Sequence, residues 1–149
     1  MDMKRANYDL YILTQEYGPQ NRHQDWRRGV SITWEKMARG MMIKMENFRL
    51  PKNCDRIRTK LWILMPPNLY DPAGNDSFHF YQDQWMDGPI NIIDPKNGGW
   101  GPLPRLWTRS DGLGWYYCLH GQPVGAAINI LHHIRAIELE IMKSDPSVW

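Results

Sequence analysis

Cys118 is the residue whose type and setting best suit covalent chemistry. It follows the aromatic run Trp115-Tyr116-Tyr117 and precedes Leu119, His120 and the turn Gly121-Gln122-Pro123, just ahead of the strongest helix pattern in the chain. A thiol beside a Gly/Pro-bounded loop and a rigid helix can be both exposed and supported, as a nucleophilic cysteine requires. The alternative is a cysteine that packs as a small buried hydrophobe, which is common for this residue type.

His120 stands two residues beyond Cys118. An imidazole in contact with the thiol would lower the thiol's pKa or carry a proton during the reaction. Nearness in sequence does not by itself establish such a contact. His120 is therefore a candidate for acid–base chemistry at this site.

The remaining candidate groups favour neither a metal nor a cofactor. His132 and His133 are adjacent, so on a helix they point about 100° apart and cannot chelate one metal; we expect surface histidines. Cys54 lies in a Pro/Asn/Asp turn with nothing nearby that suggests a site. Gly98-Gly99-Trp100-Gly101 precedes no helix and no Lys-Ser/Thr pair, unlike a phosphate-binding loop, and no cysteine-protease signature surrounds Cys118.

Helical periodicity marks both ends of the chain. Residues 7–17 carry apolar side chains at helical spacing and stop at Gly18-Pro19. Residues 126–143 show a longer apolar stripe, formed by Ala127, Ile130, Ile134, Ile137 and Ile141. We expect a short first helix and a final helix whose stripe packs on a sheet, with His133 and Glu138 off that stripe.

Strand patterns lie between the two helices. Alternation over 30–34 and 41–46, around an Ala-Arg-Gly turn, predicts a hairpin, and 57–64 and 77–81 supply a third and a fourth strand. Residues 82–117 show no sustained periodicity but hold several turns rich in glycine or proline and four tryptophans, which predicts a long ordered loop. The expected fold is α+β: an N-terminal helix, a four-stranded antiparallel meander, a long active-site loop and a C-terminal helix on the sheet.

Composition bounds the class of protein. The 149 residues fit a single domain over 1–149, and a net charge of +2 without a basic stripe argues against nucleic-acid binding. The two cysteines, 64 positions apart, suit neither a zinc site nor a disulfide scaffold, which favours a reducing, cytoplasmic compartment. Because no signal peptide or run of 18 apolar residues is present, we expect no membrane association.

The order of these parts resembles the ubiquitin-conjugating (E2, UBC) enzyme fold. In that family a turn containing proline and tyrosine follows the third strand, as Leu64 to Pro72 does here, and the catalytic cysteine stands in a Cys-Leu pair before the second helix, as Cys118-Leu119 does. The sequence is more specifically similar to compact bacterial members of the superfamily, over residues 30–143. Their counterparts here are Phe48-Arg49-Leu50-Pro51, Ile63 to Tyr70, Asp76-Ser77-Phe78 and the stretch from Trp107 to the final helix.

The sequence also departs from the family pattern. The His-Pro-Asn tripeptide that eukaryotic members carry upstream of the cysteine is missing, and Asp111, Ser110 or a backbone amide could take the place of its asparagine. Family members carry a tryptophan soon after the cysteine, whereas this sequence has Gln122-Pro123 in that region. We expect no counterpart of the last two helices of eukaryotic members in this sequence.

The resemblance implies transthiolation. Cys118 would accept a ubiquitin-like protein from an activating enzyme as a thioester and pass it to an amine, with His120 or Asp111 as candidates to deprotonate that amine. The resemblance implies no cofactor, and it implies a bacterial antiphage operon that also encodes a JAB-type deconjugating peptidase. The alternative is a non-catalytic module of the same fold that binds a ubiquitin-like protein, which the missing His-Pro-Asn favours.

Overall fold

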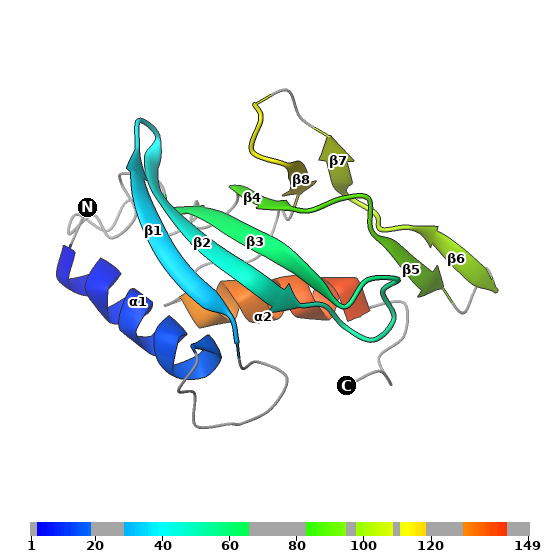
Figure 1. Cartoon of the computed structure of the whole chain (residues 1–149), viewed down its shortest axis with the longest axis horizontal. Coiled ribbons are helices and arrows are strands. Elements are labelled where there is room, and N and C mark those ends of the chain that lie inside the picture. The colour runs from blue at the N-terminus through cyan, green and yellow to red at the C-terminus, as the bar shows by residue number, and fades with distance from the viewer. Residues whose placement is uncertain are drawn as a thin grey trace.

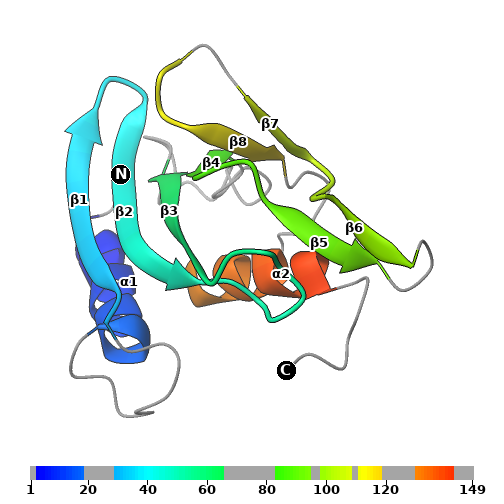
Figure 2. The ribbon, with the colours of Figure 1, turned by 45° about the vertical axis from the view of Figure 1, so that its right-hand side comes forward.

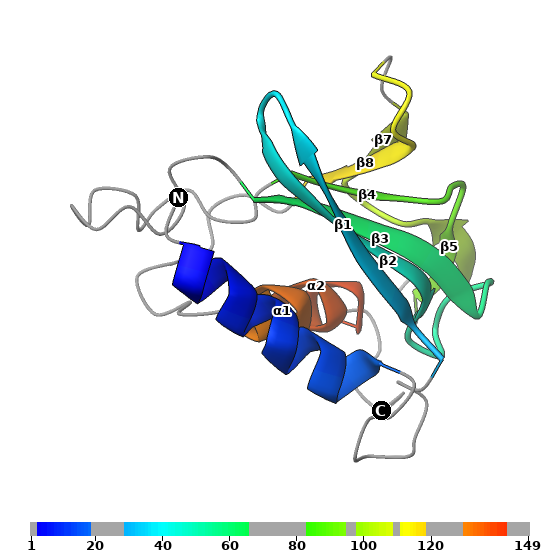
Figure 3. The same cartoon turned by 60° about the vertical axis from the view of Figure 1, so that its left-hand side comes forward.

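The structure is a computed structural model that describes residues 3–18, 29–65, 83–94, 98–108, 111–118 and 130–142. It is an α+β fold in which an antiparallel six-stranded sheet has the strand order β1-β2-β3-β4-β8-β7 (Figure 1). A separate hairpin pairs β5 with β6. Both helices lie on the same face of the large sheet, as the side view in Figure 3 shows.

The elements have the following bounds. The helices are α1 (Met3–Tyr17) and α2 (Ile130–Met142). The strands are β1 (Ser31–Met37), β2 (Gly40–Arg49), β3 (Arg58–Met65), β4 (Asp83–Met86), β5 (Asn91–Asp94), β6 (Gly99–Pro102), β7 (Leu106–Thr108) and β8 (Trp115–Cys118).

The helices and the first three strands follow the sequence patterns. β1 and β2 form the predicted hairpin, and β3 pairs antiparallel with β2. The first helix begins at Met3, four residues before the predicted start. The described part of the final helix lies inside the predicted range 126–143. The fourth strand predicted at 77–81 lies outside the described residues.

The prediction of one long loop over 82–117 is wrong. Five short strands, β4 to β8, occur in the described parts of this segment, and β4, β8 and β7 extend the large sheet. These strands are only three or four residues long, and β4 is buried on both faces because Trp85 on one face and Gln84 and Met86 on the other are fully buried. Such strands give no alternating pattern that a sequence window can detect.

The main core fills the space between the sheet and the two helices. Ile130, Ile134, Ile137 and Ile141 of α2 are buried there, as the predicted stripe requires. Figure 2 shows the β5–β6 hairpin beside the C-terminal end of α2. Asn53 joins the two, because its side-chain amide donates to the Ile141 carbonyl and its own carbonyl accepts from the Ile93 amide.

A smaller apolar cluster covers the helix-free face of the sheet. Its buried members are Met42, Leu64, Trp85 and Tyr116. Side chains along a strand alternate between faces, so these residues lie opposite the main core. Neither described helix is long and apolar enough to cross a membrane.

Candidate active site around Cys118

Cys118 is the last residue of β8 and packs against the cluster on the helix-free face. β8 lies between β4 and β7, and the Cys118 amide donates to the Arg105 carbonyl at 2.8 Å. The side chain is partly exposed, whereas Cys54 is buried. Cys118 is therefore held at the end of an inner strand and not within a long loop, with its thiol at the surface of the helix-free face.

Asp83 is the nearest carboxylate that the strand register identifies. It pairs directly with Cys118 across β4 and β8, and directly opposed side chains have Cβ atoms about 4.5–5.5 Å apart on the same face. The Tyr116 hydroxyl donates to Asp83 Oδ1 at 2.8 Å, which holds the carboxylate over this face. The arrangement places an oriented carboxylate beside the thiol.

Sequence reasoning missed Asp83 and Tyr116. Asp83 is 35 positions from Cys118, and its segment has no strand pattern. Only the pairing of β4 with β8 brings the two side chains together. The Tyr-Tyr-Cys run carried one usable signal, because alternation along a strand puts Tyr116 and Cys118 on one face.

The carboxylate of Asp83 places an acidic group on the same face as the thiol. Once the sulfur is acylated it carries no charge, and the same carboxylate then attracts a cationic amine and can accept its proton.

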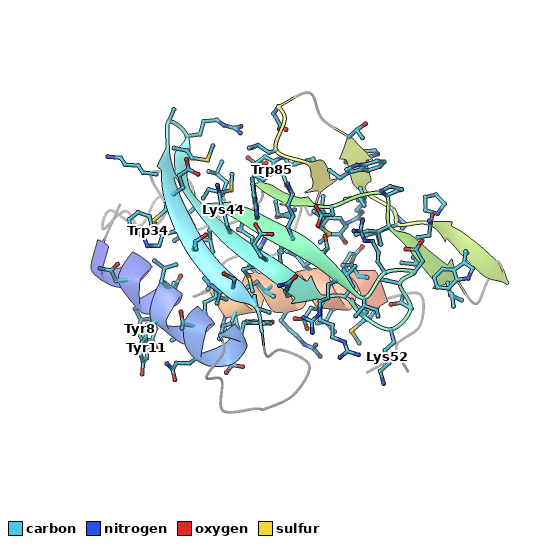
Figure 4. The ribbon with its side chains drawn as sticks, in the orientation of Figure 1. Tyr8, Tyr11, Trp34, Lys44, Lys52 and Trp85 are labelled. Atoms are coloured by element: carbon cyan, nitrogen blue, oxygen red, sulfur yellow. The ribbon has the colours of Figure 1, made fainter. Side chains whose placement is uncertain are left out.

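Asp111, a predicted site residue, also lies over the helix-free face. Its Oδ2 accepts a hydrogen bond from the Trp85 indole at 3.2 Å, and its Oδ1 accepts from the Leu113 amide at 3.1 Å. Trp85 packs edge-on against Tyr116, with ring centroids 5.8 Å apart, and the Arg39 guanidinium lies 6.0 Å from the Trp85 ring. Figure 4 shows Trp85 on the side of β4 away from α2. His120 lies outside the described residues.

His133 supports the strand of Cys118 from the opposite face. It is buried, and its Nε2 lies 3.0 Å from Gln84 Oε1, while Gln84 Nε2 donates a hydrogen bond to the Tyr117 carbonyl. Because the Gln84 oxygen must then accept, His133 Nε2 carries the proton. Burial lowers the pKa of His133 to about 3, so the ring is neutral. These two hydrogen bonds connect α2 through Gln84 to Tyr117 of β8, the residue before Cys118.

The prediction that His132 and His133 are both surface residues is therefore wrong for His133, although His132 is exposed. The buried face of α2 is wider than its isoleucine stripe. It also includes Glu138, which was expected off the stripe but is 1% exposed and accepts a hydrogen bond from the Tyr17 hydroxyl at 2.8 Å. The apolar pattern could not show this, because a polar side chain with a buried partner looks like a surface residue in sequence.

The two cysteines differ in their suitability as nucleophiles. Burial, and to a lesser extent Asp55, raise the pKa of the Cys54 thiol to about 12. Cys54 is therefore a packed thiol that ionises poorly at neutral pH. The described residues contain no group of three or more His, Cys, Asp or Glu side chains placed to hold a metal ion.

Comparisons with known proteins add no family. The chain matches no protein-family model, and searches of curated proteins and of solved structures likewise give no significant match. The chemistry of the site therefore rests on its own geometry: a partly exposed thiol at a strand end and an opposed and oriented carboxylate. Asp111, held on Trp85, precedes the opposite end of β8 from Cys118.

Proposed function

We propose that this chain is a conjugating enzyme that carries a ubiquitin-like protein as a thioester on Cys118. The observation that carries the proposal is the placement of Cys118, partly exposed at the end of β8 and directly opposite Asp83. A thioester is already activated, so the protein chiefly has to position the acyl carbon and the incoming amine. A cysteine fixed in a sheet, with a carboxylate on the same face, meets both needs.

The reaction takes two acyl transfers. In the first, Cys118 Sγ attacks the thioester carbonyl of the charged activating enzyme. A new S–C bond forms, the S–C bond to the activating enzyme breaks, and the departing thiolate takes up a proton in place of the one that Cys118 has lost. In the second, an amine nitrogen of the target attacks the Cys118 thioester, an amide bond forms and the Cys118 thiolate leaves. The proton lost by the amine passes to a carboxylate or imidazole at the site, for which Asp83, Asp111 and His120 are the candidates.

The wider setting follows from the sequence resemblance. The partners would be an activating enzyme and a ubiquitin-like protein, with a JAB-type peptidase in the same pathway, in the bacterial cytoplasm and in defence against phage. The α+β arrangement of the described residues, with an antiparallel sheet and Cys118 ahead of a C-terminal helix, is compatible with the fold that the resemblance implies.

A charging assay tests the function. The chain is incubated with an activating enzyme, its ubiquitin-like protein and ATP, and the products are separated with and without reductant. We expect an adduct that reductant removes, that Cys118→Ala abolishes and that the matched control Cys54→Ala retains. Cys118→Ser should give a reductant-resistant oxyester. If the activating enzyme is charged but no adduct forms, the non-catalytic binding module is the better account.

Asp83 has its own test within this assay. Asp83→Asn removes the charge but keeps the shape and the hydrogen bond from Tyr116, so we expect charging of Cys118 to persist. Transfer from the thioester to free lysine should slow by about 100-fold or more if Asp83 takes the proton. An unchanged discharge rate would assign the proton to another group.

A further inference from the structure

A small hollow with a basic lining lies in the loop between β2 and β3, apart from the Cys118 site. Its volume is about 170 Å³, and its charged lining side chains are Arg49, Lys52 and Arg56. No acidic side chain of the described residues lines it. Lys52 lies at the outer edge of the loop (Figure 4). Three basic residues therefore line one hollow.

Asp55, the acidic residue within the same loop, is hydrogen-bonded to Asn91. Both carboxylate oxygens of Asp55 accept hydrogen bonds from Asn91, one from its amide at 2.9 Å and one from its side chain at 2.8 Å. These bonds, together with Arg56, lower the pKa of Asp55. Even with Asp55 included, this group of side chains keeps a net charge of +2.

The floor of the hollow is buried and preformed. Leu50, Pro51 and Cys54 are buried, and the loop is closed by hydrogen bonds from the Leu50 amide to the Ile57 carbonyl at 2.9 Å and from the Cys54 amide to the Pro51 carbonyl at 3.1 Å. The Cys54 thiol is neutral because burial raises its pKa to about 12, so it does not repel an anion. An anion entering here would lie against a preformed, buried floor, beside which its attraction to the cations is stronger than in open water.

We propose that this hollow binds a single phosphate-type dianion, either free or as an ester. The volume is below the range of about 300–1,000 Å³ that holds a drug-sized ligand, so it suits one anionic group and not a whole nucleotide. Arginine forks bind phosphate oxygens in pairs, and a phosphate has enough acceptor oxygens for two arginines and a lysine. A carboxylate has only two oxygens and one charge. The proposal does not depend on the chemistry of Cys118.

The test uses the full chain and inorganic phosphate at constant ionic strength, followed by amide NMR. We expect saturable shifts centred on residues 50–57, with affinity reduced about fivefold or more in Arg49→Gln and in Lys52→Gln. Lys36→Gln, which removes an exposed lysine of β1, should bind like the wild type. Because Lys52 is exposed, its variant decides the outcome if Arg49→Gln does not fold.

Two further probes complete the test. O-Phospho-L-serine binding more tightly than inorganic phosphate identifies a phosphate ester as the ligand, and the reverse order identifies free phosphate. The proposal is overturned if the shifts do not saturate, if acetate binds as tightly as phosphate, or if Lys52→Gln and Lys36→Gln behave alike.

Discussion

Buried His133 should make the stability of the fold depend on pH. The imidazole has an ordinary pKa of 6.5, and burial lowers it to about 3 in the folded chain. Between these values the unfolded chain binds a proton that the folded chain does not. The contribution of neutral His133 to the free energy of unfolding is therefore fully present above pH 6.5 and is lost as the pH drops from 6.5 toward 3. From pH 7 to pH 5, linkage gives a loss of about 2 kcal/mol from this one group.

His133→Gln tests that magnitude. Glutamine keeps a hydrogen-bond donor for Gln84 but does not titrate, so the variant should lose about 2 kcal/mol less than the wild type between pH 7 and pH 5. The measurement is the free energy of unfolding from urea titrations at both values. His132→Gln, on the exposed side of the same helix, is the matched control and should follow the wild type.

NMR of the wild-type imidazole gives an independent check. His133 should show the neutral tautomer protonated at Nε2 at pH 5, because Gln84 Oε1 accepts that proton. Equal losses of stability in the wild type and His133→Gln would refute the reasoning. A protonated His133 at pH 5 in the folded chain would refute it as well.

Two further substitutions test how the elements are held. Tyr17→Phe removes the hydroxyl that donates to buried Glu138, and should lower the free energy of unfolding by about 1–3 kcal/mol in urea titrations; a change within error would show that the bond contributes nothing. In Gly88→Ala the new Cβ would lie 2.2 Å from the Trp115 indole, so we expect the free energy of unfolding to fall by about 1–3 kcal/mol. In the control Gly99→Ala the new Cβ would meet no heavy atom within 4 Å, so this substitution should be tolerated. Equal tolerance of both alanines would contradict the packing of Trp115 on Gly88.

The long elements of this fold could be predicted from the sequence because their side-chain periods repeat several times. The β1–β2 hairpin, β3 and both helices each extend over at least seven residues, enough for alternation or a helical stripe to stand out. The α+β class follows from them. β4 and β8 are four residues each, and their positions in the sheet depend on pairing with segments distant in sequence, which no local pattern encodes.

The residues of the candidate site also differ in whether the sequence alone could predict them. Cys118 could be selected from its place before the final helix, and Asp111 from its place upstream. Asp83 could not, because only the β4–β8 register brings it beside Cys118. The burial of His133 could not be predicted for a related reason, because its hydrogen-bond partner Gln84 lies on another element.

One measurement tests the central claim most directly: the mass of the tryptic peptide that carries Cys118 after the charging reaction. Cleavage after Arg109 and Arg135 gives residues 110–135, which contain Cys118 but not Cys54. We predict that this peptide gains the C-terminal remnant of the ubiquitin-like protein, that thiol treatment removes it, and that the Cys54 peptide gains nothing. An unmodified 110–135 peptide, recovered while the activating enzyme is fully charged, would contradict the assignment of Cys118 as the acyl carrier.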